Sequence, residues 1–225
     1  MIWDSTYLLL IPAFILAIYA QGKVQKTYKK YMKYANAGGY TGADVARKLL
    51  DLNGLYEIPI EMISGTLTDH YDPAKRVMRL SKDVYASDSI AALGVAAHET
   101  GHAIQHKEGY FPLKIRSSIV PIANFGSNLA WPLFLLGLIM GYTPLLNAGI
   151  ILFSAAVLFQ LITLPVEFNA SSRAIKLLGS EDILSRNEIG PAKEVLSAAA
   201  LTYVAATFES ILQLFRLIIL RERRD

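Results

Sequence analysis

The sequence predicts a mainly α-helical integral membrane protein with a small α+β core outside the bilayer. Of its 225 residues, 53% are hydrophobic and the mean hydropathy is +0.34, which is too apolar for an ordinary soluble domain. Long uncharged stretches occur at the start, in the middle and near the end of the chain. Between them, helical and strand-like patterns surround a histidine-rich segment. We therefore expect one compact core carried by three or four transmembrane helices.

Composition also limits the functions that this chain can have. There is no cysteine, so disulfides and thiolate metal sites are excluded, and any metal must be bound by His, Asp or Glu. The net charge of +3 is modest and is explained by basic residues near membrane boundaries. No nucleic-acid partner is expected.

The first predicted transmembrane helix covers residues 5–22, which carry no charge. A cleaved signal peptide is the alternative, but that would begin with a basic segment. Here Asp4 comes first, and the lysines follow the apolar stretch instead, at Lys23, Lys26, Lys29, Lys30 and Lys33. We interpret residues 1–22 as an uncleaved anchor.

A second uncharged block runs from Ser117 to Val166 and contains no histidine either. The segment GYTPLLN at 141–147 supplies a turn near its middle, so two helices of about 20 residues each would cross the bilayer. A buried helical hairpin of a soluble protein is the alternative. We expect residues 117–166 to be a transmembrane hairpin.

The lysine cluster after the first span sets the predicted orientation. Because cytoplasmic loops are enriched in Lys and Arg, residues 23–116 should be cytoplasmic and the N-terminus outside. The hairpin then returns the chain to the cytoplasm at Glu167.

The final predicted region, 167–225, begins with a helical pattern and ends with a further apolar stretch from Ser197 to Leu220. Glu209, Gln213 and Arg216 form a polar stripe on one face of this stretch. Two placements stay open. The apolar stretch either crosses the bilayer as a fourth span with its polar stripe facing protein, or packs along the core and the membrane interface.

Within the core, residues 41–54 are typical of a helix, with Thr41 as N-cap, Asp44 three residues on and Gly54 at the end. Residues 56–63 and 75–81 alternate like strands, and the connection between them is rich in turn formers. A long helix should follow over 87–106, capped by Ser87 or Asp88 and stopped near Gly109.

The long helix carries His98, His102 and His106, three of the four histidines in the chain. Residues i and i+4 of a helix lie on one face about 6 Å apart, so two such imidazoles can bind one zinc ion. Residues i and i+8 are separated by about 12 Å along the axis. Two neighbouring histidines can therefore share a metal, but all three cannot.

Glu99 decides between the two possible pairs. In HETGH at 98–102 a glutamate follows the first histidine, which is the arrangement of a general base beside a metal-activated water. The pair His102 and His106 has Ala103 in that position and would lack a base. We therefore predict His98 and His102 as ligands, Glu99 as base, and no metal role for His106; two helix histidines without a metal are the alternative.

A catalytic zinc normally has three protein ligands and a water. Glu167 is the leading candidate for the third, because it is the first charged residue after the hairpin and begins a helical pattern. His70 and Asp72, in the turn-rich connection, are the alternatives, and Glu167 as a simple interfacial cap is another.

These residues resemble a known family. HETGH, the preceding GTLTDHYDPAKRVMRLS and the later PVEFNASSRA are similar to the YugP-type neutral zinc metallopeptidases of bacterial membranes, over nearly the whole chain. A more distant resemblance is to gluzincin membrane proteases of the HtpX and CAAX-protease kinds. It implies a minimal gluzincin-like core in which a later helix supplies the glutamate ligand in the pattern E-x-x-A-D, matched here by Glu167, Ala170 and Ser171.

The resemblance has one departure, at Ser171, where the wider pattern has an aspartate that would hold a ligand histidine. Asp69 or Asp72 could substitute for it. The resemblance further implies that residues 75–81 form an edge strand lining the cleft, in which Val77, Met78, Arg79 and Leu80 pair with the substrate backbone.

The sequence thus predicts a zinc-dependent endopeptidase of the bacterial cell membrane, with its active site at the cytoplasmic side. Tyr203, His70 and Arg173 are candidates for stabilising the oxyanion. The partners would be a peptide or membrane-protein substrate and the lipid bilayer; a homo-oligomer and a regulatory membrane partner stay open. The rival hypothesis is a non-catalytic membrane scaffold or adaptor with structural zinc or none.

Overall fold

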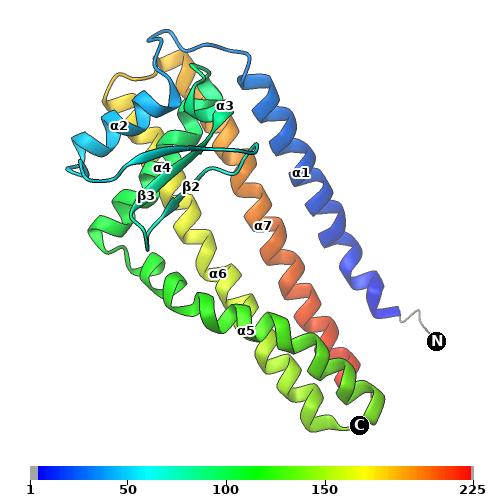
Figure 1. Ribbon diagram of the computed structural model, residues 1–225. Helices are drawn as coiled ribbons and strands as arrows, with labels where there is room; N and C mark the ends of the chain where they lie inside the picture. The colour runs from blue at the N-terminus through cyan, green and yellow to red at the C-terminus, as the bar shows by residue number, and fades with distance from the viewer. Residues whose placement is uncertain (1–4, 224–225) are drawn as a thin grey trace. The chain divides into compact units, whose positions relative to one another are not determined.

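A computed structural model describes residues 5–223 of the chain, shown in Figure 1. The structure is mainly helical with one three-stranded sheet, and this confirms the predicted fold class. In chain order the elements are η1 (Ser5–Leu10), α1 (Ile11–Tyr31), α2 (Gly42–Leu52), β1 (Ile60–Ile63), β2 (His70–Asp72), β3 (Val77–Ser81), α3 (Lys82–Tyr85), α4 (Ile90–Glu108), α5 (Phe111–Met140), α6 (Thr143–Ser180) and α7 (Arg186–Glu222).

The chain forms two compact units, each assembled from separate segments. Among the described residues, the first contains 5–21, 111–165 and 201–223, which hold most of the apolar helical length. The second contains residues 22–110 and 166–200 and includes the sheet, α2, α3 and α4. We call them the membrane unit and the core unit. The unit boundaries fall inside α1, α6 and α7, so single helices contribute to both.

Helix α2 begins and ends as its sequence predicts. The Thr41 side chain accepts a hydrogen bond from the Asp44 amide, and the Asp44 carboxylate accepts one from the Thr41 amide. This capping box satisfies two backbone donors that the first turn leaves unpaired. After the helix, Gly54 adopts a left-handed φ of 63°. The apolar face of α2 is buried and packs on α4.

The sheet has the order β1-β3-β2, with β1 parallel and β2 antiparallel to β3. Strand β3 is therefore the middle strand, and the prediction that Val77, Met78, Arg79 and Leu80 form an edge strand is wrong. Met78 and Arg79 pair with a neighbouring strand on each side, so the middle of β3 is not free to pair with a substrate backbone. The edge strand β2 occupies residues that were expected to form only turns.

Helix α4 is the central helix of the core unit and contacts α2, α3, β2 and β3. Its N-cap is Ser89, whose side chain accepts a hydrogen bond from the Ala92 amide, so the predicted caps Ser87 and Asp88 are two and one residues too early. At the other end Gly109 has a φ of 66°, the left-handed conformation that ends many helices. Small buried residues along α4, such as Ala92, Ala96 and Ala97, allow its neighbours to pack closely.

Within residues 5–223, four helical segments are long and apolar enough to cross a membrane: Ser5–Tyr31, Phe111–Met140, Thr143–Ser180 and Arg186–Glu222. The undecided apolar stretch near the C-terminus is thus part of a fourth candidate span. Within the membrane unit, its Arg216 is buried, lies over the Tyr7 ring and donates to Thr6 Oγ1. Part of the polar stripe therefore faces protein, as expected if this stretch is a fourth span.

Candidate metal centre

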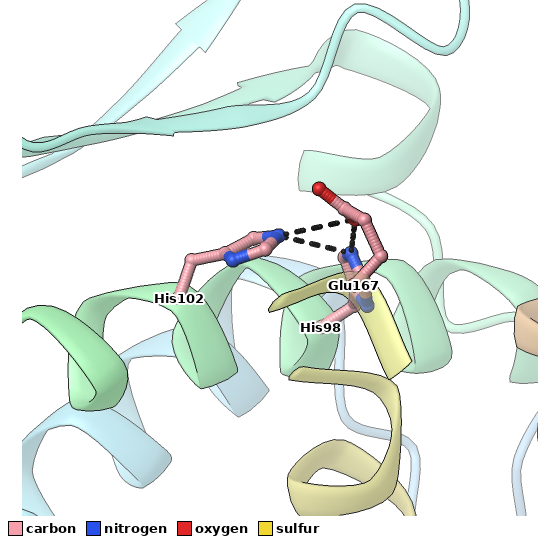
Figure 2. Close-up of side chains that lie close together, drawn as sticks. All are labelled: His98, His102 and Glu167. Carbon is pink, nitrogen blue, oxygen red and sulfur yellow. Dashed lines mark hydrogen bonds and ion pairs between the residues drawn. The ribbon is translucent and has the colours of Figure 1, made fainter. Parts of the chain in front are cut away.

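The structure brings three predicted ligand residues together in the core unit. His98 and His102 lie one turn apart on α4, and Glu167 approaches them from α6 (Figure 2). The two imidazole Nε2 atoms are 3.2 Å apart, and Glu167 Oε2 lies 3.3 Å from the first and 3.5 Å from the second. Glu167 is only 2% exposed. Three lone-pair atoms thus converge on one point.

This spacing fits a zinc ion. Two ligand atoms that are each about 2.1 Å from a tetrahedral zinc lie about 3.4 Å from one another. All three observed separations fall within 0.2 Å of that value. Two imidazoles and one carboxylate are also the donor set of catalytic zinc sites, which keep a fourth position open for water. The residues present therefore fit the ion on both geometry and chemistry.

Gly101 explains how α6 comes close enough. It lies between the two ligand histidines on α4, and a Cβ added there would be 2.7 Å from the backbone oxygen of Ala170. No side chain larger than hydrogen is accommodated at that distance from a backbone atom. The glycine of HETGH therefore lets α4 and α6 cross in contact, which places Glu167 beside the histidines.

Glu99 lies next to the three ligands and is held by strand β2. Its Oε2 accepts a hydrogen bond of 3.0 Å from the backbone amide of Tyr71, and the side chain is 8% exposed. Burial raises the pKa of the Glu99 carboxyl, and the nearby Glu167 carboxylate adds to this, while His98 and His102 act in the opposite direction. A carboxyl with a raised pKa is suited to accept and return a proton near neutral pH.

The other ring nitrogen of each ligand histidine also has a partner. Ser171 Oγ lies 3.1 Å from His98 Nδ1, and Gln105 Oε1 lies 3.1 Å from His102 Nδ1. Ser171 thus occupies the place where the wider pattern has an aspartate. The two substitutes that we considered are engaged elsewhere: Asp69 accepts hydrogen bonds from Ser81, and Asp72 binds Arg79.

Burial and charge act against each other at His102. Burial alone would lower the pKa of this imidazole, but the Glu167 and Glu99 carboxylates outweigh it and raise the pKa. The same two carboxylates would favour any cation at this position, whether a proton or a metal ion.

Comparison with known proteins agrees with this geometry. Residues 6–222 match the family described as "Putative neutral zinc metallopeptidase". The chain belongs to this family. It is also 53% identical, over 212 residues, to the "Putative membrane protease YugP" of Bacillus subtilis (strain 168), which covers 94% of each chain. No solved structure matches.

Other residues singled out in the sequence lie in different surroundings. His70 is exposed on β2, where its Nδ1 is 2.8 Å from the Thr68 carbonyl. Arg173 donates from Nε to Asn169 and forms an ion pair with Glu108. Tyr203 lies on α7 in the membrane unit. Oxyanion stabilisation by any of the three stays a prediction.

His106 is not part of the ligand cluster and instead contacts strand β2. Its Nδ1 lies 2.9 Å from the hydroxyl of Tyr71, the residue whose backbone amide holds Glu99. The third histidine of the helix therefore contacts the strand whose Tyr71 amide binds the Glu99 carboxylate.

Sequence reasoning missed three residues of this site: Tyr71, Gln105 and Asn169. Gln105 carried a signal that could have found it, since it follows His102 by three residues and so lies on the same helix face. Asn169, which accepts hydrogen bonds from Gln105 and Arg173, and Tyr71 carried no such signal, because only the tertiary fold brings them to α4.

Proposed function

We propose that this chain is a zinc-dependent endopeptidase of the bacterial cell membrane, with its active site at the cytoplasmic side. The observation that carries the proposal is the spacing of His98 Nε2, His102 Nε2 and Glu167 Oε2, with the Glu99 carboxyl beside them. Family membership supports the same reaction class.

His98, His102 and Glu167 would hold the ion. When bound, zinc supplies Lewis acidity, which lowers the pKa of a water and polarises the scissile carbonyl. Glu99 takes the proton of the attacking water and later delivers it to the leaving amine. The amide of Tyr71 keeps the Glu99 carboxyl in place, because its hydrogen bond joins the base to a sheet rather than to a mobile loop.

Burial supports the role of Glu99. Its raised pKa favours return of the proton to the leaving group, and its low exposure limits competing exchange with bulk water. A structural zinc site would be closed by four protein ligands and would have no use for a carboxyl beside them. The three convergent ligand atoms support the catalytic type.

The decisive experiment compares wild type with Glu99→Gln, purified in detergent with zinc, on a casein-type protein and on membrane proteins. We expect the variant to lose roughly 10²- to 10⁴-fold in cleavage rate while its zinc content stays unchanged. Glu181→Gln, a change at a carboxyl just beyond α6, is the matched control and should cleave like wild type. Equal cleavage by Glu99→Gln and wild type would overturn the mechanism. Four protein ligands without a water, or no zinc, would favour the scaffold.

The same inactive variant can identify the substrate class. Because Glu99→Gln keeps the ligands, it should retain uncleaved peptide or membrane-protein substrates in membranes, and these can be identified after co-purification. Wild type treated alike should retain fewer, since it releases products.

The cytoplasmic location can be tested with single cysteines, because the chain has none of its own. Lys82, exposed at the start of α3 in the core unit, is a suitable position. We expect Lys82→Cys in intact bacteria to react with a membrane-impermeant maleimide only after the membrane is opened. Labelling in intact cells would place the core unit outside.

A further inference from the structure

Gln105 is a buried polar side chain that contacts the predicted ligand His102 on the side away from the metal position. It lies on α4, three residues after His102, and is 0% exposed. Its amide nitrogen donates to the carbonyl of Val166 and to Asn169 Oδ1, both at 2.9 Å. Its amide oxygen lies 3.1 Å from His102 Nδ1. Every polar atom of Gln105 therefore has a partner.

These partners leave one orientation for the amide. The Val166 carbonyl can only accept, so it must face the NH₂ group of Gln105 and not its oxygen. Asn169 Oδ1 is in turn identified as the oxygen, because Arg173 Nε donates to it at 2.7 Å. An ion pair of 2.7 Å with Glu108 holds the Arg173 guanidinium. The orientation of Gln105 is thus determined from two sides.

The orientation of Gln105 determines where His102 carries its proton. The Gln105 oxygen can only accept, so a hydrogen bond between it and His102 Nδ1 requires the proton to be on Nδ1. In the neutral imidazole, the Nε2 atom, which faces Glu167 and His98, is then left with the lone pair. A neutral imidazole in this form is ready to bind a metal without losing a proton.

We propose that Gln105 is a positioning residue that holds His102 in its Nδ1–H form and thereby prepares Nε2 for the metal. This rests on the proposed function only in that the ion bound is zinc. Asn169 and Arg173 act through Gln105, because they fix the direction of its amide.

Among the described residues, His98 has no partner at Nδ1 that can only accept a hydrogen bond. Its Nδ1 faces the hydroxyl of Ser171, and a hydroxyl can donate as well as accept. Either ring nitrogen of His98 can therefore carry the proton in the metal-free protein. The two predicted ligand histidines are equivalent in the motif, but only His102 has a hydrogen-bond partner that determines which ring nitrogen carries the proton.

The first test measures zinc affinity by competition with a chelator for wild type, Gln105→Leu and Ser171→Ala. Loss of an outer partner of a metal ligand typically weakens metal binding roughly 10- to 100-fold, and we expect this for Gln105→Leu and a smaller loss for Ser171→Ala. Gln213→Leu, the same change on α7 in the membrane unit, is the matched control and should bind zinc like wild type. Unchanged affinity in Gln105→Leu would overturn the proposal.

The second test needs neither zinc nor a variant of Gln105. The chain has four histidines, so nitrogen NMR of ¹⁵N-histidine protein in detergent can assign each ring, with His102→Ala identifying the signal of interest. We expect His102 to be Nδ1–H in metal-free wild type; an Nε2–H form would overturn the proposal. If wild type bound no zinc and cleaved nothing, the peptidase hypothesis would fail, while this spectrum would still decide the form of His102.

Discussion

The two halves of α6 both pack closely against a neighbouring helix at a glycine, but the two contacts have different consequences. In the membrane unit, residues 143–165 pack against α5 through glycines, and a Cβ at Gly149 would lie 2.8 Å from the Ala130 carbonyl. In the core unit, residues 166–180 cross α4 at Gly101, where the corresponding distance is 2.7 Å to the Ala170 carbonyl. In both, a missing side chain lets two helix backbones touch.

The difference lies in what the contact brings together. The α5–α6 contact joins apolar surfaces, so close approach there adds packing alone. The α4–α6 contact joins Glu167 and Ser171 to the histidines and Val166 and Asn169 to Gln105. Close packing of helices thus produces a candidate metal site only where polar side chains meet at the crossing with complementary donors and acceptors.

Replacing Glu167, the predicted ligand on α6, should have the largest effect on zinc binding and cleavage. We expect Glu167→Gln to weaken zinc binding by more than roughly 100-fold, beyond the range for outer partners of a metal ligand, and to abolish cleavage. Zinc content after dialysis and cleavage of a casein-type protein are the measurements. Glu181→Gln should keep both, and a Glu167→Gln protein that retained zinc would remove this residue from the site.

The two glycines provide a direct test of the comparison. Gly101→Ala forces α4 and α6 apart, so zinc binding and cleavage should be lost, whereas Gly149→Ala should only destabilise, by about 1–3 kcal/mol as for other overpacked sites. Zinc bound per folded molecule separates the two outcomes. If Gly149→Ala also lost zinc at full folding, the division of roles along α6 would be wrong.

Zinc should stabilise the folded chain through the core unit. At a free zinc concentration 100 times Kd the gain is about 2.7 kcal/mol, which corresponds to roughly 5–10 °C in Tm for a chain of this size. Thermal unfolding in detergent with and without chelator measures it, and re-added zinc should restore the Tm. In Glu167→Gln the chelator should change nothing; an equal shift there would indicate a different metal site.

The smallest expected effect concerns the strand that holds the base. Tyr71→Phe removes the contact with His106 but keeps the amide that binds Glu99, so the loss should be about 1 kcal/mol, or roughly fivefold in cleavage rate. Zinc content should not change. His106→Phe should give the same loss in cleavage rate. The double variant should lose no more than either single variant, because each substitution removes the same Tyr71–His106 contact. Additive losses would show that the two residues act separately.

Much of this architecture could be predicted because it depends on local pattern. Uncharged stretches predicted the spans, the Thr41–Asp44 pair predicted the start of α2, and Gly109 predicted the end of α4. The residues of the metal cluster followed from helix geometry, since His98 and His102 must share a face, and from the isolation of Glu167 after the hairpin. The caps and the histidine pair depend on residues a few positions apart, whereas Glu167 was found from its place after the long uncharged block.

The rest depended on contacts between distant segments. The prediction of an edge strand at 75–81 was wrong because only two strands were expected, and a third strand, β2, pairs with the side of β3 that would otherwise have been free. Strand β2 was missed since Asp72 and its neighbours are typical of turns. Asn169 was missed because a buried amide is recognised only when its partners are known, whereas the i+3 spacing of Gln105 from His102 was a local signal that was not used.

The sheet order also bears on how this chain avoids aggregation. Only β1 and β2 have a free edge, and they are four and three residues long. Pro59 comes directly before β1 and Pro73 directly after β2, and proline has no amide hydrogen with which to lengthen a ladder. Short strands that end at prolines are poor templates for a second copy of the chain, so the exposed edges of this sheet disfavour edge-to-edge association between core units.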